Sequence, residues 1–235
     1  MKQITALGDS IIRGVVPSSL HSQTGIRYSI LDDSFSARCS TMLGFDIKNH
    51  GRFGNTVGNC LKELKRRSSL IANSDFVVIE LGGNDCDYNW HEIATDPNAS
   101  HSPITPIKKF TQQYSRLING IRSLGSQPII LSLPPIIADL YFNTITLKMN
   151  AQQRRNVIEW LGGSIDSISR WHEMYNVELF KIARKLSTPI IDITTPFLEI
   201  HNIRKYFCYD GIHPNENGHH IIAETICRIV QPMIK

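Results

Sequence analysis

Short apolar runs alternate with longer stretches of helical period along this chain. Five of the runs are rich in Ile, Val and Leu and show little alternation of polar and apolar positions. This pattern is typical of strands in a parallel sheet that is covered on both faces. We expect these strands at residues 3–7, 45–49, 76–81, 128–133 and 189–193.

Apolar residues that recur at steps of three and four predict amphipathic helices between these strands. The clearest patterns cover residues 107–124 and 165–186, and residues 216–229 are expected to form a closing helix. Gly44 and Gly125 each follow a helical pattern, at a position where a left-handed residue would end the helix. Because strands alternate with helices, the expected fold class is α/β, a three-layer α/β/α sandwich of about five parallel strands.

One connection is longer than this pattern requires. Residues 134–163 separate a predicted strand from the next clear helix, whereas such connections usually take about 2–6 residues. We interpret the segment as an insertion that packs over one edge of the sheet and is a candidate cover for the active site. The total length is ordinary for one unit, so residues 1–235 are expected to form a single domain.

The charge pattern favours no nucleic-acid partner. The net charge is +4, and the only tight basic cluster is Lys62, Lys65, Arg66 and Arg67. Nucleic-acid binders usually gather such residues over one whole face. We interpret the cluster as the solvated face of a helix, with a phosphate-contacting patch as the alternative.

The cysteines number five, and no CxxC pattern occurs, so neither a disulfide framework nor a metal site is expected. Cys39, Cys60 and Cys227 fall in apolar helical stretches, which favours small core residues. The chain begins without the apolar segment of a signal peptide, and no apolar run approaches the roughly 20 residues that span a bilayer. We therefore expect a cytoplasmic location and no membrane partner.

Polar, glycine-rich sequences follow the first three predicted strands and precede the last helix. Ligands bind outside the carboxyl ends of the strands in open α/β sheets, so these junctions are expected to meet at one rim. The four sequences are Gly8-Asp9-Ser10, Gly51-Arg52-Phe53-Gly54-Asn55-Thr56, Gly82-Gly83-Asn84-Asp85 and Asp210-Gly211-Ile212-His213.

Three residues of these junctions suit nucleophilic catalysis. Ser10 lies at a tight turn into a helix, and a serine hydroxyl becomes a good nucleophile when a base removes its proton. His213 is the candidate base, since imidazoles ordinarily titrate near neutrality. Asp210 precedes it by three residues, a spacing that lets the carboxylate hold one ring nitrogen.

Attack on an ester also creates an oxyanion, which needs hydrogen-bond donors already in place. The candidates are the backbone N–H groups of Ser10 and Gly54 and the side-chain amide of Asn84. A glycine suits this role because the substrate can approach its backbone closely. Gly51 and Gly58 are alternatives to Gly54.

The four junctions, in this order, resemble the motifs of the GDSL or SGNH hydrolases. The resemblance spans almost the whole chain and implies a flavodoxin-like fold, usually without a metal or cofactor. It gives Ser10, His213 and Asp210 the roles of nucleophile, base and orienting acid. It gives Ser10, Gly54 and Asn84 the oxyanion hole, and Gly54 fits the family spacing best.

The resemblance implies a serine esterase or acylhydrolase, because family members are lipases, thioesterases, arylesterases and carbohydrate esterases. We expect small acyl or O-acetyl esters as substrates, including acetylated carbohydrates, since no extended apolar stretch suits a lipid-facing surface. Alternatives are an acyltransferase with the same triad and a non-catalytic binding module on the same fold. A phosphate- or nucleotide-binding protein ranks last, because the first turn matches neither a Walker nor a GxGxxG pattern. Ile11 replaces the family's usual leucine with a residue of similar volume.

Several other residues keep two interpretations. Asp9 either orients the nucleophile turn or only caps a helix. His219 and His220 diverge by about 100° on a helix, so we interpret both as surface or partly packed residues rather than metal ligands. Cys86 is expected near the site without a role. Four aromatic residues either line a pocket or pack as core: Tyr141, Phe142, Trp160 and Trp171.

Overall fold

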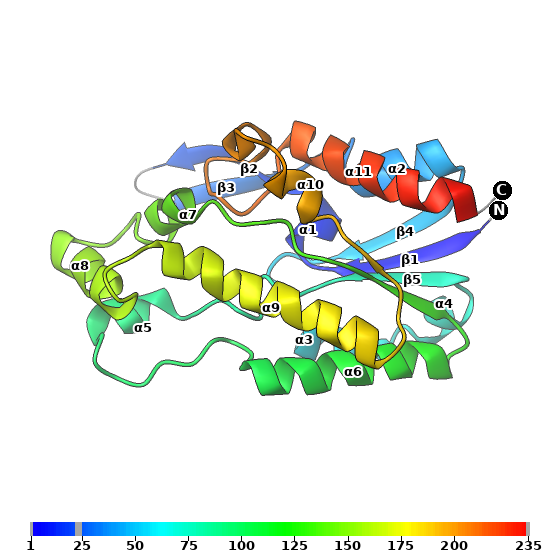
Figure 1. Cartoon of the computed structure of the whole chain (residues 1–235), viewed down its shortest axis with the longest axis horizontal. Coiled ribbons are helices and arrows are strands. Elements are labelled where there is room, and N and C mark those ends of the chain that lie inside the picture. Colours follow the sequence, from blue (N-terminus) through cyan, green and yellow to red (C-terminus); the bar gives the residue numbers. More distant parts are fainter. Residues whose placement is uncertain (1, 22–24, 234–235) are drawn as a thin grey trace.

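The centre of the computed structural model is a five-stranded parallel sheet with strand order β4-β1-β5-β6-β7 (Figure 1). The structure describes residues 2–21 and 25–233. The sheet contains β1 (Gln3–Gly8), β4 (Asp46–Gly51), β5 (Phe76–Glu80), β6 (Gln127–Leu131) and β7 (Ile190–Ile191). All neighbouring strands are parallel, so the five predicted strands are confirmed, although β7 is only two residues long.

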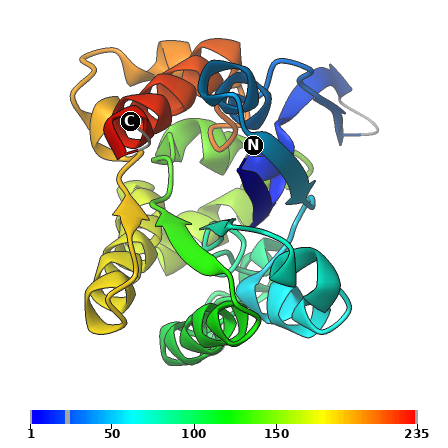
Figure 2. The ribbon, with the colours of Figure 1, turned by 90° about the vertical axis from the view of Figure 1, so that its right-hand side faces the viewer.

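Helices cover both faces of the sheet, which confirms the three-layer fold class (Figure 2). One face carries α3 (Val57–Leu64), α6 (Ile107–Ser123) and α9 (Asp166–Lys185). The other face carries α1 (Ser10–Arg13), α2 (Phe35–Leu43) and α11 (Glu216–Val230). The helices α6, α9 and α11 are the three that the sequence pattern predicted.

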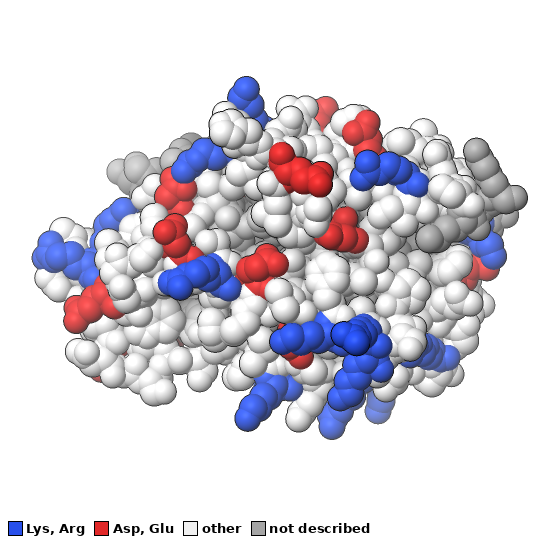
Figure 3. All heavy atoms as spheres, viewed as in Figure 1, with Lys and Arg blue, Asp and Glu red and all other residues white. Residues whose placement is uncertain are grey.

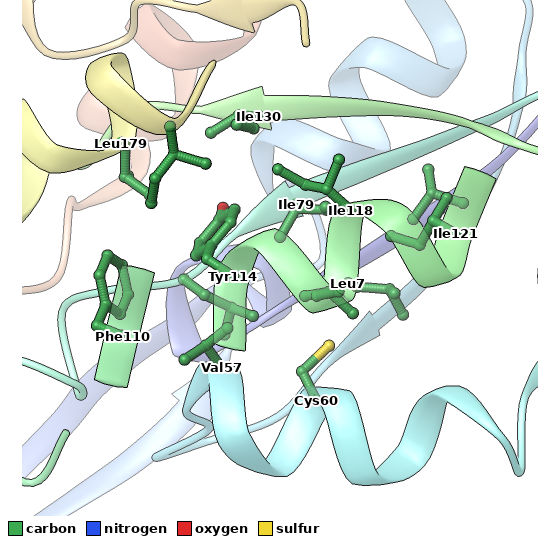
Figure 4. Close-up of a cluster of buried hydrophobic side chains, with 14 of the residues drawn as sticks. Leu7, Val57, Cys60, Ile79, Phe110, Tyr114, Ile118, Ile121, Ile130 and Leu179 are labelled. Atoms are coloured by element: carbon green, nitrogen blue, oxygen red, sulfur yellow. The ribbon is translucent and has the colours of Figure 1, made fainter. Parts of the chain in front are cut away.

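The strands β1, β5, β6 and β7 contribute to both hydrophobic clusters, because successive side chains point to opposite faces; the edge strand β4 contributes only Ile47, to the cluster under α2 and α11. Leu7 and Ile79 pack with Tyr114 in the cluster under α3 and α6 (Figure 4). Ala6, next to Leu7, packs in the cluster under α2 and α11. Burial on both faces explains why the strand runs lack polar alternation. Full burial of a side chain such as Leu7 contributes about 1.5–3 kcal/mol.

The strand order places a crevice at the carboxyl end of β1. The chain forms β4 on one side of β1 and β5 on the other, so that Gly8 lies opposite both Gly51 and Glu80. The segments that leave these two strands diverge on either side of the turn that follows β1. Ligands bind at such a point in open α/β sheets, and Ser10 lies directly after it.

An antiparallel hairpin of β2 (Val15–His21) and β3 (Gly25–Ile30) forms a separate sheet. The sequence analysis predicted no strands there, and in the structure residues 27–30 are exposed, so no buried run marks the hairpin. The hairpin pairs Val15 with Ile30 and Pro17 with Tyr28. It follows α1 directly, and it therefore lies beside the crevice.

The long segment 134–163 contains two helices that the sequence analysis did not predict, α7 (Ala138–Ile145) and α8 (Ala151–Trp160). With α5 (Trp90–Thr95) and the start of α9, these helices bury a third hydrophobic cluster, in the left part of Figure 1. The α8 helix begins with a capping box, in which the side chains of Asn150 and Gln153 accept each other's backbone N–H. It was missed because Val157 is its only fully buried residue.

The basic cluster lies at the end of α3 and in the turn that follows. Lys62, Lys65 and Arg66 are exposed, which agrees with a solvated surface. Arg67 departs from that interpretation, because it is half-buried. Its guanidinium hydrogen-bonds to Glu63 Oε2 at 3.4 Å and to His50 Nδ1 at 2.6 Å.

The smaller sequence predictions also have clear outcomes. Gly44 and Gly125 follow α2 and α6 with left-handed φ angles of 65° and 92°, as predicted. Cys39, Cys60 and Cys227 are buried, and all five cysteines are free. Within residues 2–21 and 25–233, no helix has the length and the hydropathy to cross a bilayer. The remaining segments are α4 (Ser68–Ala72), α10 (Thr195–Leu198) and the short 3-10 turns Ile203–Tyr206 and Gln231–Met233.

Candidate active site

The turn that carries Ser10 packs tightly against the end of β4. Asp9 caps α1 by accepting a hydrogen bond from the Ile11 N–H at 2.9 Å, and Ser10 is the first residue of that helix. A Cβ atom on Gly51 would lie 2.4 Å from the backbone nitrogen of Arg13 and 2.8 Å from the carbonyl oxygen of Asp9. Gly51 is therefore needed for packing, which weighs against it as the oxyanion glycine.

A continuous chain of hydrogen bonds joins the three predicted catalytic residues. The Ser10 Oγ lies 2.9 Å from His213 Nε2, and His213 Nδ1 lies 2.6 Å from Asp210 Oδ2. The serine and histidine are separated by 203 positions in the sequence. Ser10 is 7% exposed, His213 1% and Asp210 0%. The structure thus brings together the groups that a nucleophile, a base and an orienting carboxylate require.

The Asp210–His213 pair is held by its own turn. Asp210 Oδ1 accepts from the N–H groups of Ile212 at 3.3 Å and His213 at 3.2 Å. Gly211, between them, has a φ of 79°, which favours glycine. The carboxylate is therefore fixed by three bonds, one of which holds the imidazole in a single orientation.

Two aromatic rings shield the imidazole from solvent. Tyr28 of the hairpin contacts His213 edge-on, with ring centroids 5.5 Å apart, and Phe53 stacks on it at 6.3 Å. Tyr28 and Phe53 also contact each other at 5.0 Å. These contacts place the segment after β4 beside His213, and the sequence analysis gave neither aromatic residue a role.

The three predicted oxyanion donors retain free N–H groups. Neither the Ser10 N–H nor the Gly54 N–H finds an acceptor within the described chain. Asn84 uses one amide hydrogen to donate to Asp9 Oδ2 at 2.9 Å, which leaves its second hydrogen available. Gly54 is exposed, with a φ of 68°, and follows Phe53 directly. Ser10 and Asn84 share one cavity wall, whereas Gly54 lies outside it.

Asp85 ties the Asn84 turn to the segment that carries Gly54. Its carboxylate is fully buried and accepts from the Val57 N–H at 3.0 Å, at the start of α3. Burial raises the pKa of Asp85 to about 6, although hydrogen bonds from Thr105 and Val57 oppose the rise. Asp85 therefore connects the two segments that carry the predicted oxyanion donors Asn84 and Gly54, a role that the sequence analysis did not assign.

A buried pair of carboxyl groups lies beneath the nucleophile turn. Asp9 is 2% exposed and Glu80 1% exposed, and the two carboxyl groups lie close enough to influence each other's titration. Burial raises the pKa of Glu80 well above its ordinary value, and the charge of Asp9 adds to the rise. Burial also raises the pKa of Asp9, but the Ile11 N–H and the Asn84 amide favour its ionised form. Glu80 therefore holds the proton of the pair, and Asp9 both caps α1 and orients Asn84.

A cavity of about 450 Å³ opens beside Ser10. Its catalytic end contains Asp9, Ser10, Glu80, Asn84 and His213. Its far end is formed by aromatic and apolar side chains from the third hydrophobic cluster and α9. This volume lies within the range of small-molecule sites. The aromatic members of the wall are Tyr88, Trp90, Tyr141, Trp160 and Trp171.

The family model of the GDSL-like lipase/acylhydrolases matches residues 6–221 of the chain. The chain belongs to this family. As a family member it is a carboxylic ester hydrolase, and the four junctions that suggested the resemblance all lie within the matched residues. A sequence search of curated proteins gives no match.

Several solved structures share this GDSL hydrolase's fold at low sequence identity. The lipase/acylhydrolase from Enterococcus faecalis is 16% identical with a TM-score of 0.64, and the match covers 99% of this chain and 97% of that one. An acetylxylan esterase from Geobacillus stearothermophilus is 19% identical with a TM-score of 0.61, covering 97% and 93%. A carbohydrate acetylesterase from Sinorhizobium meliloti is 13% identical with a TM-score of 0.66, covering 99% and 100%.

The structure of this GDSL hydrolase corrects one interpretation and settles others. His219 is fully buried, not a surface residue, because it stacks on Phe35 and accepts its N–H; His220 is exposed. Tyr141, Trp160 and Trp171 line the cavity, whereas Phe142 packs in the third cluster. Within the described residues, no group of three or more His, Cys, Asp or Glu side chains is arranged to hold a metal ion.

The sequence analysis gave no role to three residues that line the cavity. Glu80 is the one carboxylate in the apolar run of β5, which is a readable signal for a special role. His172 falls on the apolar stripe of α9, four residues after Ile168 and three before Tyr175, where a polar ring is unusual. Cys86 is buried in the cavity wall, and burial raises the pKa of its thiol far above the ordinary value.

Proposed function

We propose that the chain is a serine ester hydrolase that works through an acyl-enzyme on Ser10. The observation that carries the proposal is the hydrogen-bonded chain from Ser10 to His213 to Asp210 at the mouth of a cavity. In the first step, Ser10 Oγ attacks the ester carbonyl while His213 Nε2 takes its proton. The C–O bond to the alcohol breaks, and His213 returns the proton to the leaving oxygen.

The second step releases the acid. His213 takes a proton from water, the hydroxide attacks the acyl-enzyme, and the proton returns to Ser10 Oγ as the bond to the serine breaks. Asp210 stabilises the imidazolium that forms twice in each cycle. The free N–H groups of Ser10 and Gly54 and the second hydrogen of Asn84 supply the oxyanion donors in this proposal.

Small acyl or O-acetyl esters are the proposed substrates. Two structures of the same fold are named as an acetylxylan esterase and a carbohydrate acetylesterase, which makes an acetylated carbohydrate one candidate. Transfer to an alcohol in place of water is the alternative with the same triad. Product analysis with added alcohols separates the two, because a transferase forms a new ester in proportion to the acceptor.

A cytoplasmic location belongs to the same proposal. All five cysteines are free, and the sulfur atoms of Cys39 and Cys227 lie 3.9 Å apart without a bond between them. Unbonded thiols at this separation are typical of a reducing compartment.

The test is hydrolysis of p-nitrophenyl acetate by the wild-type protein and by Ser10→Ala. We expect the variant to fall to the uncatalysed rate with an unchanged circular dichroism spectrum. Ser34→Ala is a matched control, since Ser34 is also a buried serine at the start of a helix but lies outside the cavity wall. Retained activity in Ser10→Ala would overturn the proposal.

A further inference from the structure

The far end of the cavity is built from aromatic rings. All three tryptophans of the chain line it: Trp90 from α5, Trp160 from α8 and Trp171 from α9. Tyr88 lies among them, with its ring centroid 4.8 Å from that of Trp160 and 5.6 Å from that of Trp171. Such a wall gives a flat ring several edge-to-face partners.

The indole N–H groups of two of these rings are engaged within the wall. The Trp90 Nε1–H donates to Asp87 Oδ1 at 2.7 Å, and the Trp171 Nε1–H donates to the Cys86 carbonyl at 2.9 Å. The Tyr141 hydroxyl is buried near the same carboxylate, and burial together with the charge of Asp87 raises the pKa of Tyr141 well above its ordinary value. The carboxylate of Asp87 therefore fixes Trp90, and the rings of Trp90 and Trp171 present carbon to a ligand.

The described wall of the cavity has no cationic side chain and few amides to offer a substrate rich in hydroxyl groups. No described lysine or arginine lines it, and Asn84 at the catalytic end is the one side-chain amide in the described wall. The cationic side chains gather elsewhere, for example over α6 and α9 in the lower part of Figure 3. A carbohydrate needs several hydrogen-bond partners, and leaving its hydroxyls unpaired in an apolar cavity is costly.

The one imidazole of the described cavity wall besides His213 has no hydrogen-bond partner among the described residues. His172 is 5% exposed and lies in the wall next to Trp171. Neither of its ring nitrogens forms a hydrogen bond with any described residue. Burial lowers the pKa of His172 to about 4, so the ring is neutral near pH 7 and has one donor and one acceptor.

We propose that this cavity binds an aromatic ring of the ester, and that His172 hydrogen-bonds to a polar substituent such as a phenolic hydroxyl on that ring. The inference rests on the proposed function, because the bound ring belongs to a substrate only if Ser10 cleaves esters. It makes hydroxyaryl esters, with the ring on the acyl or the alcohol side, the favoured substrate class. Carbohydrate esters are the competing outcome of the test.

Binding of small neutral probes to the wild-type protein tests the inference without any turnover. The three indole N–H signals in a ¹H–¹⁵N spectrum all report on this cavity, because the chain has no tryptophan elsewhere. We expect p-cresol to shift them saturably, with an affinity about 3- to 10-fold above that of 4-methylcyclohexanol, for its aromatic contacts. The inference would be overturned if methyl xyloside bound as tightly as p-cresol or more tightly, or if the indole N–H signals did not shift when p-cresol was added.

Substitution of the histidine tests the hydrogen bond. We expect wild-type protein to prefer p-cresol over toluene by about 3- to 10-fold, and His172→Phe to lose that preference while still binding toluene. His172→Leu is a smaller second variant with the same expectation, and His172→Gln should retain the preference. His201→Phe is the control, because His201 is exposed and outside the cavity wall. A preference that persists in both apolar variants would remove His172 from the proposal.

Ester turnover keeps the two proposals separate. Phenyl acetate and methyl 4-hydroxybenzoate carry the ring on opposite sides of the ester, so their relative kcat/KM shows which half enters the cavity. If p-cresol binds but no ester is cleaved, the proposed function alone fails. If small esters are cleaved through Ser10 but p-cresol does not shift the indole N–H signals, the proposed aromatic site alone is wrong.

Discussion

The two ends of the cavity differ in how their side chains are held. At the catalytic end, Asp210 accepts three hydrogen bonds within its own turn, and Asp9 accepts from both Ile11 and Asn84. These groups follow the strands of the sheet or a short local turn. At the far end, Trp90 and Trp160 lie on α5 and α8, and their positions depend on packing between helices.

The two ends of the cavity therefore have different expected roles: one determines the rate of the chemical step, and the other determines which ester is bound. Local turns fix the catalytic groups, so changes there should alter the rate of the chemical step and leave the fold intact. The far end is formed by tertiary contacts, and the same wall contains the unpartnered imidazole of His172, so changes at these residues should alter which ester is bound. The predictions below test this division.

The largest effect is expected at the orienting carboxylate. Asp210→Asn keeps the shape of the side chain but removes the charge that stabilises the imidazolium, so kcat should fall by about 10⁴-fold. The measurement is hydrolysis of p-nitrophenyl acetate, with thermal unfolding as a check on the fold. A loss of less than tenfold would show that the catalytic end does not work as a triad.

Removal of an oxyanion donor should have the next largest effect. Asn84→Ala is expected to lower kcat by about 10²–10³-fold with little change in KM, since the donor acts on charge that develops in the transition state. Steady-state kinetics on phenyl acetate measure both constants. A rise in KM at unchanged kcat would place Asn84 in substrate binding instead.

The fold could be predicted from the sequence where a helix or strand buries apolar side chains at regular spacing. The strand runs and the helices α6, α9 and α11 have such stripes, and the catalytic end follows because its residues sit directly after strands. The spacing of Asp210 and His213 is local, so their contact could also be predicted. By contrast, the edge-on contact of Tyr28 with His213 depends on the β2–β3 hairpin, which no periodic pattern predicts.

The far end of the cavity was less predictable for the same reason. The α8 helix buries little, and Trp160 meets Trp90 only after residues 134–163 fold back on α5. The position of His172 on the apolar stripe of α9 can be predicted from the sequence pattern, but its lack of a hydrogen-bond partner depends on tertiary packing. The sequence therefore predicts the reaction better than the substrate.

The acid stability of the protein should report on His172. Its folded pKa of about 4 lies below the unfolded value near 6.5, so the unfolded state binds more protons and stability is lost as the pH falls from about 6.5 to 4. Relative to His172→Gln, the wild-type protein should lose up to about 3 kcal/mol across this window. Urea unfolding at several pH values measures the difference, and other buried groups cancel because both proteins share them. Parallel curves would show that His172 is not buried as a neutral ring.

The smallest effect is expected at the buried carboxyl pair. Glu80→Ala should lower kcat by about tenfold, because Asp9 loses the neutral partner that helps it orient Asn84. Glu80→Gln keeps a neutral donor and should retain most of the rate. Equal losses in the two variants would mean that Glu80 acts through packing alone.

The most direct test of the central claim is intact-mass analysis after treatment with a fluorophosphonate. We expect a single adduct, mapped to Ser10, that forms far more slowly in His213→Ala, because the serine hydroxyl needs the imidazole to take its proton. An adduct on a different residue, or hydrolysis of p-nitrophenyl acetate by a protein that forms no adduct, would contradict the account.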